Sequence, residues 1–232
     1  MRFQTPLIHA RLIRRYKRFL ADVTLDDGAQ AVAHCPNPGA MTGLAGEGSS
    51  LWLEPNDDPR KKLRYGWRIG TAENGAPVVV DTGLANRIVA EALAQGRIEG
   101  VKGSLRAEVP YGENSRVDFV IEDAGAQTYL EVKSVSLSRQ AGLAEFPDSV
   151  TKRGTKHLHD LAQMVAQGHR AAMLFLVVRP DCTRFKPAAD IDPAYAHALR
   201  EAAAAGVQIL CYDCDVAADH VTLRAPLPVS IA

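Results

Sequence analysis

The alternation of apolar and polar residues along the chain indicates a β-rich amino-terminal region. Five short segments, 7–16, 19–25, 31–34, 50–53 and 63–69, place apolar residues at every second position. This period is typical of strands with one buried face. Turn-forming residues separate the segments, as in Asp26-Asp27-Gly28. Five short strands with intervening turns predict a small closed β-barrel of the OB type over residues 1–82.

Beyond residue 82 the period changes to that of helices. Apolar residues at helical spacing predict helices over 83–96, 152–167 and 193–205. Buried strands are predicted over 171–178 and 207–212, with shorter strands over 105–109 and 221–223, whereas 137–148 is expected to be a loop that covers the site. Helices that alternate with buried strands predict an α/β domain over 83–232, with its sheet covered on both faces.

The centre of this second region is a predicted hairpin with carboxylates on both strands. Residues 115–121 and 127–134 alternate like strands, and the polar segment 122–127 reads as the loop between them. Pairing that is symmetric about the loop places Asp118 opposite Glu131 and Arg116 opposite Lys133. The side chain of Lys133 lies on the same face as that of Glu131.

Two opposed carboxylates predict a bound cation. Like charges at paired positions destabilise a sheet, and carboxylate oxygens are the ligands that Mg²⁺ prefers, with Mn²⁺ as an alternative. We therefore expect Asp118 and Glu131 to hold the metal and Lys133 to assist an attacking water or to neutralise charge on a phosphate. Glu91 and Glu108 are weaker candidates for neighbours of this metal. An ordinary exposed strand face is the alternative explanation of Glu131 and Lys133.

The charge of the chain gives no overall attraction to nucleic acid, because 27 basic residues balance 27 acidic ones. Basic residues do gather in three segments, near residues 11–18, 60–68 and 152–159. One such cluster is typical of a solvated surface, but three beside a metal-type site favour contact with a phosphate backbone. The candidate nucleic-acid contacts are Arg11, Arg14, Arg15, Lys17, Arg64, Arg116, Arg153, Lys156 and His157. The expected partner is DNA, with a single strand or RNA as alternatives.

Hydropathy and cysteine content favour a soluble cytoplasmic protein without a membrane partner. No apolar run has the length needed to span a bilayer, and the first residues lack the apolar stretch of a signal peptide. Four cysteines in 232 residues do not make a disulfide framework. Cys211 and Cys214 form a lone C-x-x-C pair, for which zinc binding or redox activity is a minority interpretation. The oligomeric state stays open, with a homodimer among the alternatives.

Several motifs spread over the chain carry a family resemblance. They are Thr5-Pro-Leu-Ile8, Cys35-Pro-Asn-Pro-Gly-Ala-Met-Thr-Gly43, Leu84-Ala-Asn-Arg87, Glu113-Asn-Ser-Arg-Val-Asp-Phe119, Glu131-Val-Lys-Ser-Val135, Phe146-Pro-Asp148 and Arg153-Gly-Thr-Lys-His157. With them, almost the whole chain resembles the sugar fermentation stimulation protein A family. Its second half also resembles the PD-(D/E)xK nuclease superfamily.

The resemblance implies a fold and a set of roles. It implies an OB-like barrel followed by a restriction-endonuclease-like α/β/α domain, DNA binding without marked sequence preference, and a regulatory link to sugar (maltose) metabolism. Within the superfamily, Asp118 and Glu131 hold Mg²⁺ and Lys133 serves the attacking water. One departure from the family pattern is Pro38, which stands where a Thr is expected.

Two hypotheses follow for the function. The first is a metal-dependent phosphodiesterase, in which Arg153 and Lys156 grip the backbone of the substrate. The second is a DNA-binding regulatory protein without catalysis. An Asp, a Glu and a Lys that converge on one face favour the enzyme, because binding alone does not require them.

Overall fold

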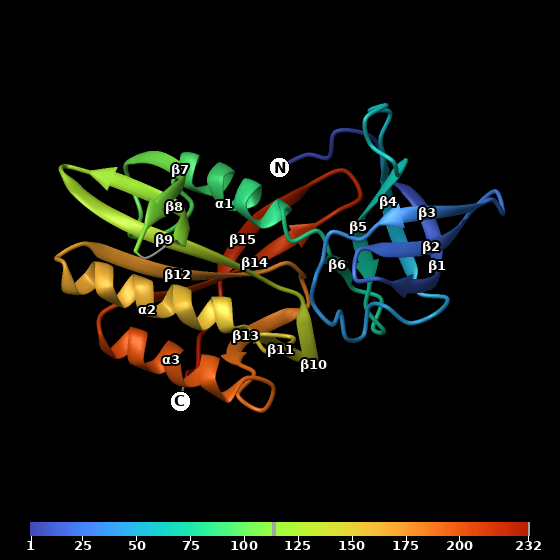
Figure 1. Cartoon of the computed structure of the whole chain (residues 1–232). Helices are drawn as coiled ribbons and strands as arrows, with labels where there is room; N and C mark the ends of the chain where they lie inside the picture. Colours follow the sequence, from blue (N-terminus) through green and yellow to red (C-terminus); the bar gives the residue numbers. More distant parts are fainter. Residues whose placement is uncertain (113–114, 232) are drawn as a thin grey trace.

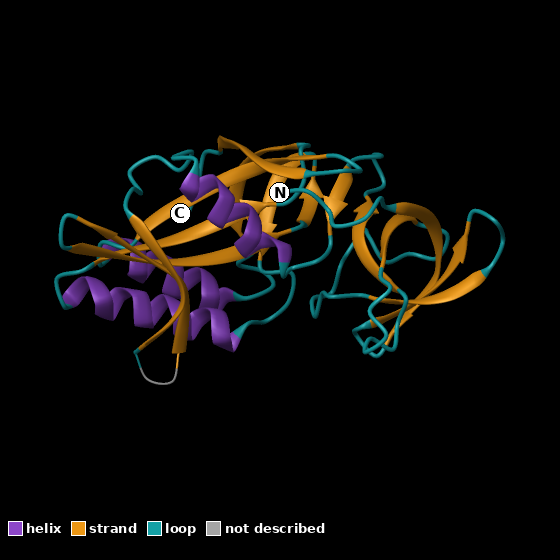
Figure 2. Cartoon of the chain, turned by 90° about the horizontal axis from the view of Figure 1, so that it is seen from above, coloured by secondary structure: helices purple, strands orange, loops and turns teal. Residues whose placement is uncertain are grey.

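The computed structural model describes residues 1–112 and 115–231, which form two domains side by side (Figure 1). Glu113 and Asn114, which belong to one of the family-like motifs, lie outside the described residues. The amino-terminal domain is a barrel of strands, and the carboxy-terminal domain is a layered α/β structure (Figures 1 and 2).

The first domain is the predicted OB barrel. Its strands are β1 (Ile8–Tyr16), β2 (Leu20–Leu25), β3 (Gln30–His34), β4 (Ser50–Pro55), β5 (Tyr65–Thr71) and the short β6 (Pro77–Val79), in the order β3-β2-β1-β4-β5-β6. A short parallel pairing of β3 with β5, which includes Ala33 with Tyr65, closes the barrel. Trp67 fills its centre without solvent exposure and satisfies its indole N–H at the carbonyl of Ile69, 3.0 Å away. The five predicted strands are confirmed, and β6 is an addition.

The second domain is an α/β sandwich, as predicted. Its large sheet contains β7 (Ser104–Tyr111), β8 (Ser115–Asp123), β9 (Ala126–Val135), β12 (Arg170–Val177), β14 (Gln208–Val216) and β15 (Val221–Pro226), in the order β15-β14-β12-β9-β8-β7. Helix α1 (Leu84–Ala94) covers one face, and α2 (Lys152–Ala166) and α3 (Pro193–Ala204) cover the other (Figure 1). Each face has its own apolar core. No helix among the described residues is long and apolar enough to cross a membrane.

A small third sheet replaces the loop that the sequence predicts over 137–148. Strands β10 (Leu137–Gln140), β11 (Gly142–Phe146) and β13 (Cys182–Pro187) pair in the order β10-β11-β13, near the end of the second domain that faces the barrel (Figure 1). The loop prediction is wrong because two features hide the strand pattern. A register shift interrupts β10, and β11 buries the charged Glu145, whose carboxylate accepts hydrogen bonds from Arg139 at 2.9 Å.

The central hairpin has the predicted register and then forks. Strands β8 and β9 pair from Asp123 with Ala126 to Phe119 with Leu130, and their ladder ends there. Beyond that point β8 stays paired with β7, whereas β9 continues beside β12 as far as Val135. The residues predicted to face each other, Asp118 and Glu131, are therefore the first positions past the last ladder pair, at the opening of the fork.

Candidate functional site

Asp118 is held at the fork by two hydrogen bonds from different elements. Its Oδ2 accepts the backbone N–H of Val132 at 2.7 Å, which replaces a ladder bond that β8 no longer makes. Its Oδ1 accepts the side-chain amide of Asn86, on α1, at 2.7 Å. Burial and the nearby Glu131 raise the pKa of the Asp118 carboxyl above its ordinary value. The protein thus keeps a carboxylate in a place where its negative charge is disfavoured.

Glu131 is almost completely buried, and only one of its oxygens is satisfied. Oε1 accepts a hydrogen bond from Nζ of Lys133 at 2.6 Å and is hydrogen-bonded to Nδ1 of His157. Burial opposes its charged form, but the His157 and Lys133 contacts outweigh burial and lower the pKa of the Glu131 carboxyl. Oε2 is buried and has no hydrogen-bond partner within the described part of the chain. Buried polar atoms are normally paired, so this oxygen is available for a ligand.

His157 links Glu131 to an arginine at the protein surface. Nε of Arg153 donates to Nε2 of His157 at 3.3 Å, so Nε2 must be the acceptor and the ring proton lies on Nδ1. In this neutral tautomer Nδ1 donates to Glu131. The 3.3 Å approach of Lys133 Nζ to Nδ1 is then a contact between two donors rather than a hydrogen bond. His157 is only 4% exposed. It therefore supports Glu131 and is not open to a DNA backbone, as the predicted nucleic-acid contact would require.

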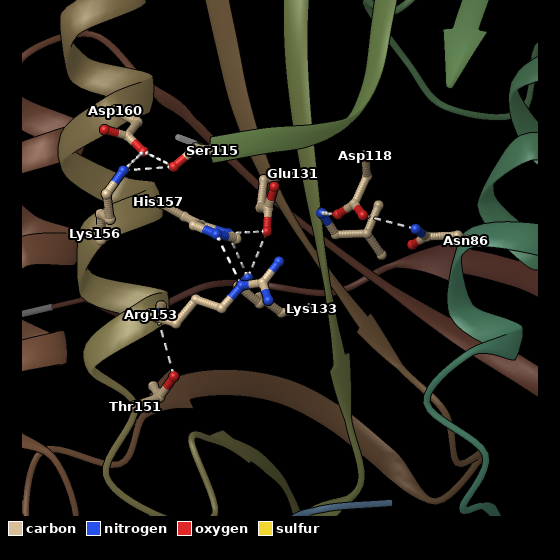
Figure 3. Close-up of polar contacts among 12 residues, drawn as sticks. Asn86, Ser115, Asp118, Glu131, Lys133, Thr151, Arg153, Lys156, His157 and Asp160 are labelled. Atoms are coloured by element: carbon tan, nitrogen blue, oxygen red, sulfur yellow. Dashed lines mark hydrogen bonds and ion pairs between the residues drawn. The ribbon is translucent and has the colours of Figure 1, made fainter. Parts of the chain in front are cut away.

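These contacts form two groups around the fork (Figure 3). On one side Arg153, His157, Glu131 and Lys133 form a connected chain, and on the other Asn86 and the Val132 amide hold Asp118.

The site fits a hard divalent cation better than a softer one. Its donors are carboxylate oxygens, one of them without a partner in the described chain, and Mg²⁺ commonly takes one or two carboxylates and keeps several waters. Across residues 1–112 and 115–231 no group of three or more His, Cys, Asp and Glu side chains could hold a metal ion. A cation at this place would have the carboxylates of Asp118 and Glu131 as its protein ligands, with any remaining positions left to water or substrate.

A second polar cluster fixes the start of β8 to α2. Nζ of Lys156 lies 2.6 Å from Oγ of Ser115 and 2.9 Å from Oδ2 of Asp160. Asp160 is 5% exposed, and Ser115 also donates to it. Nearby, the buried hydroxyl of Tyr111 has no partner among the described residues, and burial together with the negative charge of Glu131 raises its pKa. Lys156, a predicted nucleic-acid contact, thus also serves as a structural link.

The two weaker candidates for metal neighbours do not join the site. Glu91 lies on α1, and its carboxylate pairs with the amino group of Met1 at 3.1 Å. Glu108 is exposed on β7, and its carbonyl accepts a hydrogen bond from Arg116. The residue that α1 does contribute is Asn86, which the sequence pattern did not reveal. Its position in Leu84-Ala-Asn-Arg87, one of the family-like motifs, was the available signal.

The remaining predicted nucleic-acid contacts lie on both domains. Arg11, Lys17 and Arg64 are exposed on the barrel. Two others are already engaged, because Arg14 donates to Asp22 at 2.7 Å and Arg15 donates to the carbonyl of Asn37 at 2.7 Å.

Comparison with known proteins identifies the family. Residues 13–80 match the family model described as "SfsA N-terminal OB domain", and residues 83–220 match "Sugar fermentation stimulation protein RE domain". The chain belongs to the SfsA family. A sugar fermentation stimulation protein homolog from Roseobacter denitrificans is 55% identical over 235 residues, with 100% of both chains covered. The homolog from Jannaschia sp. is 52% identical and covers 99% of this chain and 97% of its own length.

A solved SfsA structure has the same fold. The structure of Pyrococcus furiosus SfsA in complex with Ca²⁺ aligns with a TM-score of 0.88 and 27% identity, over 99% of this chain and 98% of the other. The OB barrel and the restriction-endonuclease-like domain of this SfsA-family protein support nucleic-acid binding.

Proposed function

We propose that this SfsA-family protein binds DNA without marked sequence preference and hydrolyses phosphodiester bonds with a divalent cation, Mg²⁺ or alternatively Mn²⁺, held by Asp118 and Glu131. The observation that carries the proposal is the buried Oε2 of Glu131, which has no partner in the described chain and lies near the partly buried carboxylate of Asp118. The Pyrococcus furiosus SfsA structure is a complex with Ca²⁺, which supports a hard cation with oxygen ligands.

Each neighbouring side chain has a role in this reaction. A divalent cation supplies electrostatic stabilisation of the charge that develops on the phosphate. Asn86 and the Val132 amide orient Asp118, and His157 keeps Glu131 ionised. Lys133, whose side chain is 14% exposed, presents its ammonium group beside Glu131, where it orients water or neutralises phosphate charge. Arg153 is exposed at the start of α2, where it binds the backbone of the substrate.

The second candidate function is DNA binding without cleavage, in a regulatory role linked to sugar (maltose) metabolism. One observation favours it: the Lys133 ammonium and the Glu131 carboxylate already neutralise each other at 2.6 Å. A catalytic lysine has to exchange this contact for one with water or phosphate.

The Asp118→Asn substitution separates the two functions. We expect cleavage with Mg²⁺ or Mn²⁺ to fall by about 100-fold or more, because the site loses charge stabilisation. DNA affinity should change by less than about twofold, because phosphate affinity comes mainly from basic residues. A cleavage panel of single- and double-stranded DNA and RNA measures the first quantity, and fluorescence anisotropy measures the second.

Asp123→Asn is the matched control, since this carboxylate is exposed at the loop end of the same strand. It should leave both quantities unchanged. Undetectable cleavage of every substrate by the unmodified protein would leave only the binding function. In either case affinity should fall steeply with salt concentration.

A further inference from the structure

A cleft of about 420 Å³ separates the barrel from the second domain next to the candidate site. The barrel contributes Arg18 and the segment Asn37–Gly39, and the second domain contributes the end of β9 and the segment that precedes α2. Ser134, in the wall of the cleft, directly follows Lys133. Thr151, also in the wall, caps α2 just before Arg153. The lining of the cleft is therefore adjacent in sequence to two of the proposed functional residues, Lys133 and Arg153.

The walls of this cleft suit a nucleobase. The hydroxyls of Ser134 and Ser136 make no hydrogen bond to any other described residue, so they are free to pair with a ligand. Leu137, Phe146 and Val150 provide apolar surface, and Val150 is 67% exposed. A flat apolar ring with polar edges matches this combination of surfaces, and the volume lies in the range of small-ligand pockets.

The two acidic residues of the lining do not oppose such a ligand strongly. Glu145 is 1% exposed and is neutralised by Arg139 at 2.9 Å. Asp148 accepts the backbone N–H of Met41 at 3.3 Å and the hydroxyl of Ser149 at 3.3 Å. Both carboxylates are therefore occupied by contacts within the protein.

The turn between β1 and β2, whose Arg18 lines the cleft, carries positive charge and an exposed aromatic ring. Lys17 and Arg18 both adopt left-handed backbone conformations, with φ of 47° and 62°. Such conformations are costly for bulky residues and are often kept for function. Neither side chain forms an ion pair in the described structure. Phe19 is 45% exposed, and its ring lies 6.4 Å from that of His34, centroid to centroid.

We propose that this cleft and turn bind an unpaired nucleotide of the substrate strand, which makes single-stranded DNA, or a duplex with a frayed end, the substrate class of the site. Arg18 and Lys17 bind phosphates, Phe19 stacks on a base, and the cleft receives the base nearest the scissile phosphate. Bases within an intact duplex are stacked and cannot enter. The position of the scissile phosphate rests on the proposed function, whereas strand selection does not require cleavage.

Binding assays in EDTA test strand selection on the full-length protein. The probes are a fluorescein-labelled single strand and a hairpin duplex with the same number of phosphates. Arg18→Asn removes the cation but keeps a residue that tolerates positive φ, and Phe19→Ala removes the ring. Each should weaken single-strand binding about tenfold and duplex binding less than about twofold. Lys102→Ala and Leu105→Ala, which alter exposed residues of the second domain, are matched controls that should change neither affinity.

A cleft variant provides an independent measurement. Val150→Trp narrows the cleft at its most exposed wall, so it should reduce the binding of a single strand that carries 2-aminopurine and should abolish the fluorescence change of that base. Melting temperatures within a few degrees of the unmodified protein would show that the variants fold.

Equal losses for single strand and duplex, or no loss in any variant, would overturn the proposal. Single-stranded RNA that binds with the same variant effects supports recognition of unpaired strands, whereas RNA binding without single-stranded DNA binding overturns it. Strand selection without any cleavage would contradict the proposed function alone. Cleavage without strand selection would contradict this inference alone.

Discussion

At the scale of single residues, His157 orients the Glu131 carboxylate of the candidate site and keeps it ionised. Its Nδ1–H is hydrogen-bonded to Glu131, and its Nε2 is held by Arg153. We expect His157→Ala to weaken Ca²⁺ or Mn²⁺ binding by roughly 10- to 100-fold, as loss of an outer partner of a metal ligand typically does. The free energy of unfolding should also fall by about 1–3 kcal/mol, because a buried acceptor loses its donor. Calorimetric titration and urea unfolding measure these effects.

Two further variants test this role for His157. His157→Gln retains an N–H donor and should recover part of the cation affinity, which a purely steric role would not produce. His159→Ala removes an exposed histidine of the same helix and should have no effect. Equal cation affinity in the Ala and Gln variants would show that the hydrogen bond to Glu131 is unimportant.

The sequence predicted the two carboxylates and the neighbouring Lys133, but not the roles of Asn86 and His157. Asp118 and Glu131 could be found because strand period and hairpin symmetry determine their positions. Asn86 carries no comparable pattern, since a single amide on a helix acquires a role only through the strand opposite. His157 was grouped with a basic cluster, yet its spacing from Leu161 and Met164, one and two turns later, already places it on the buried face of α2.

At the scale of elements, the beginnings of α2 and α3 depend on one another. Thr151 caps α2 by accepting the N–H of Gly154 at 3.1 Å, and Asp192 caps α3 by accepting the N–H of Tyr195 at 2.9 Å. The second oxygen of Asp192 accepts the N–H of Thr151 at 2.8 Å. The buried Asp192 therefore fixes the turn from which Arg153 projects.

Cap substitutions should reveal this dependence. Thr151→Ala should cost about 1 kcal/mol of unfolding free energy, a typical value for a lost cap. Asp192→Ala should cost more, roughly 2–3 kcal/mol, because it leaves the buried N–H of Tyr195 and the partly buried N–H of Thr151 without an acceptor. Urea denaturation measures both, with Glu47→Ala as a control for loss of an exposed carboxylate. Similar costs for the two cap variants would indicate that α2 and α3 are capped independently.

The predictability of an element depended on whether its pattern was regular. Helices and the strands of the large sheet follow one period over many residues, so they were predicted closely. Strands β10 and β11 are short, irregular and partly charged; β10 pairs with β11, and β11 is stabilised by pairing with the distant β13. Pairing between segments this far apart in the chain leaves no local sequence pattern from which the strands could be predicted.

At the scale of the whole molecule, polar contacts join the two domains. The N–H of Val79, in the barrel, donates to the carbonyl of Val178 at 2.9 Å. On the turn after β5, Asn74 donates to Asp181 at 2.7 Å. Gly39 approaches Asp148 so closely that an added Cβ would overlap its carboxylate. The sequence predicted two domains, but it contained no indication of how they meet, because these contacts join segments that are far apart in the chain.

The contacts of Asp181 with Arg179 and Asn74 predict how stability depends on pH. Hydrogen bonds from Arg179 and Asn74 lower the pKa of Asp181 to about 2. Because this pKa is below that of the unfolded chain, the contacts stabilise the protein at neutral pH, and this stabilisation is lost as the pH falls from about 4 to about 2. Asp181→Asn should cost about 1 kcal/mol at pH 7, a value reduced by partial solvent screening.

The same substitution should flatten the pH dependence of unfolding in that acidic range, as measured by thermal melts. Asp27→Asn, on an exposed turn of the barrel, is a control that should leave the curve unchanged. Identical acid curves for the unmodified protein and Asp181→Asn would show that the contacts of Asp181 with Arg179 and Asn74 contribute nothing to stability.

The fork between β8 and β9 also provides a built-in reporter. The Val132 amide proton is hydrogen-bonded to the side-chain carboxylate of Asp118 rather than to a backbone carbonyl of a neighbouring strand. Any ion or substrate that draws electron density from that carboxylate must alter the chemical shift of this one proton. In an isotope-labelled sample, a single amide resonance can therefore follow occupancy of the site, whether or not a phosphodiester bond is ever broken.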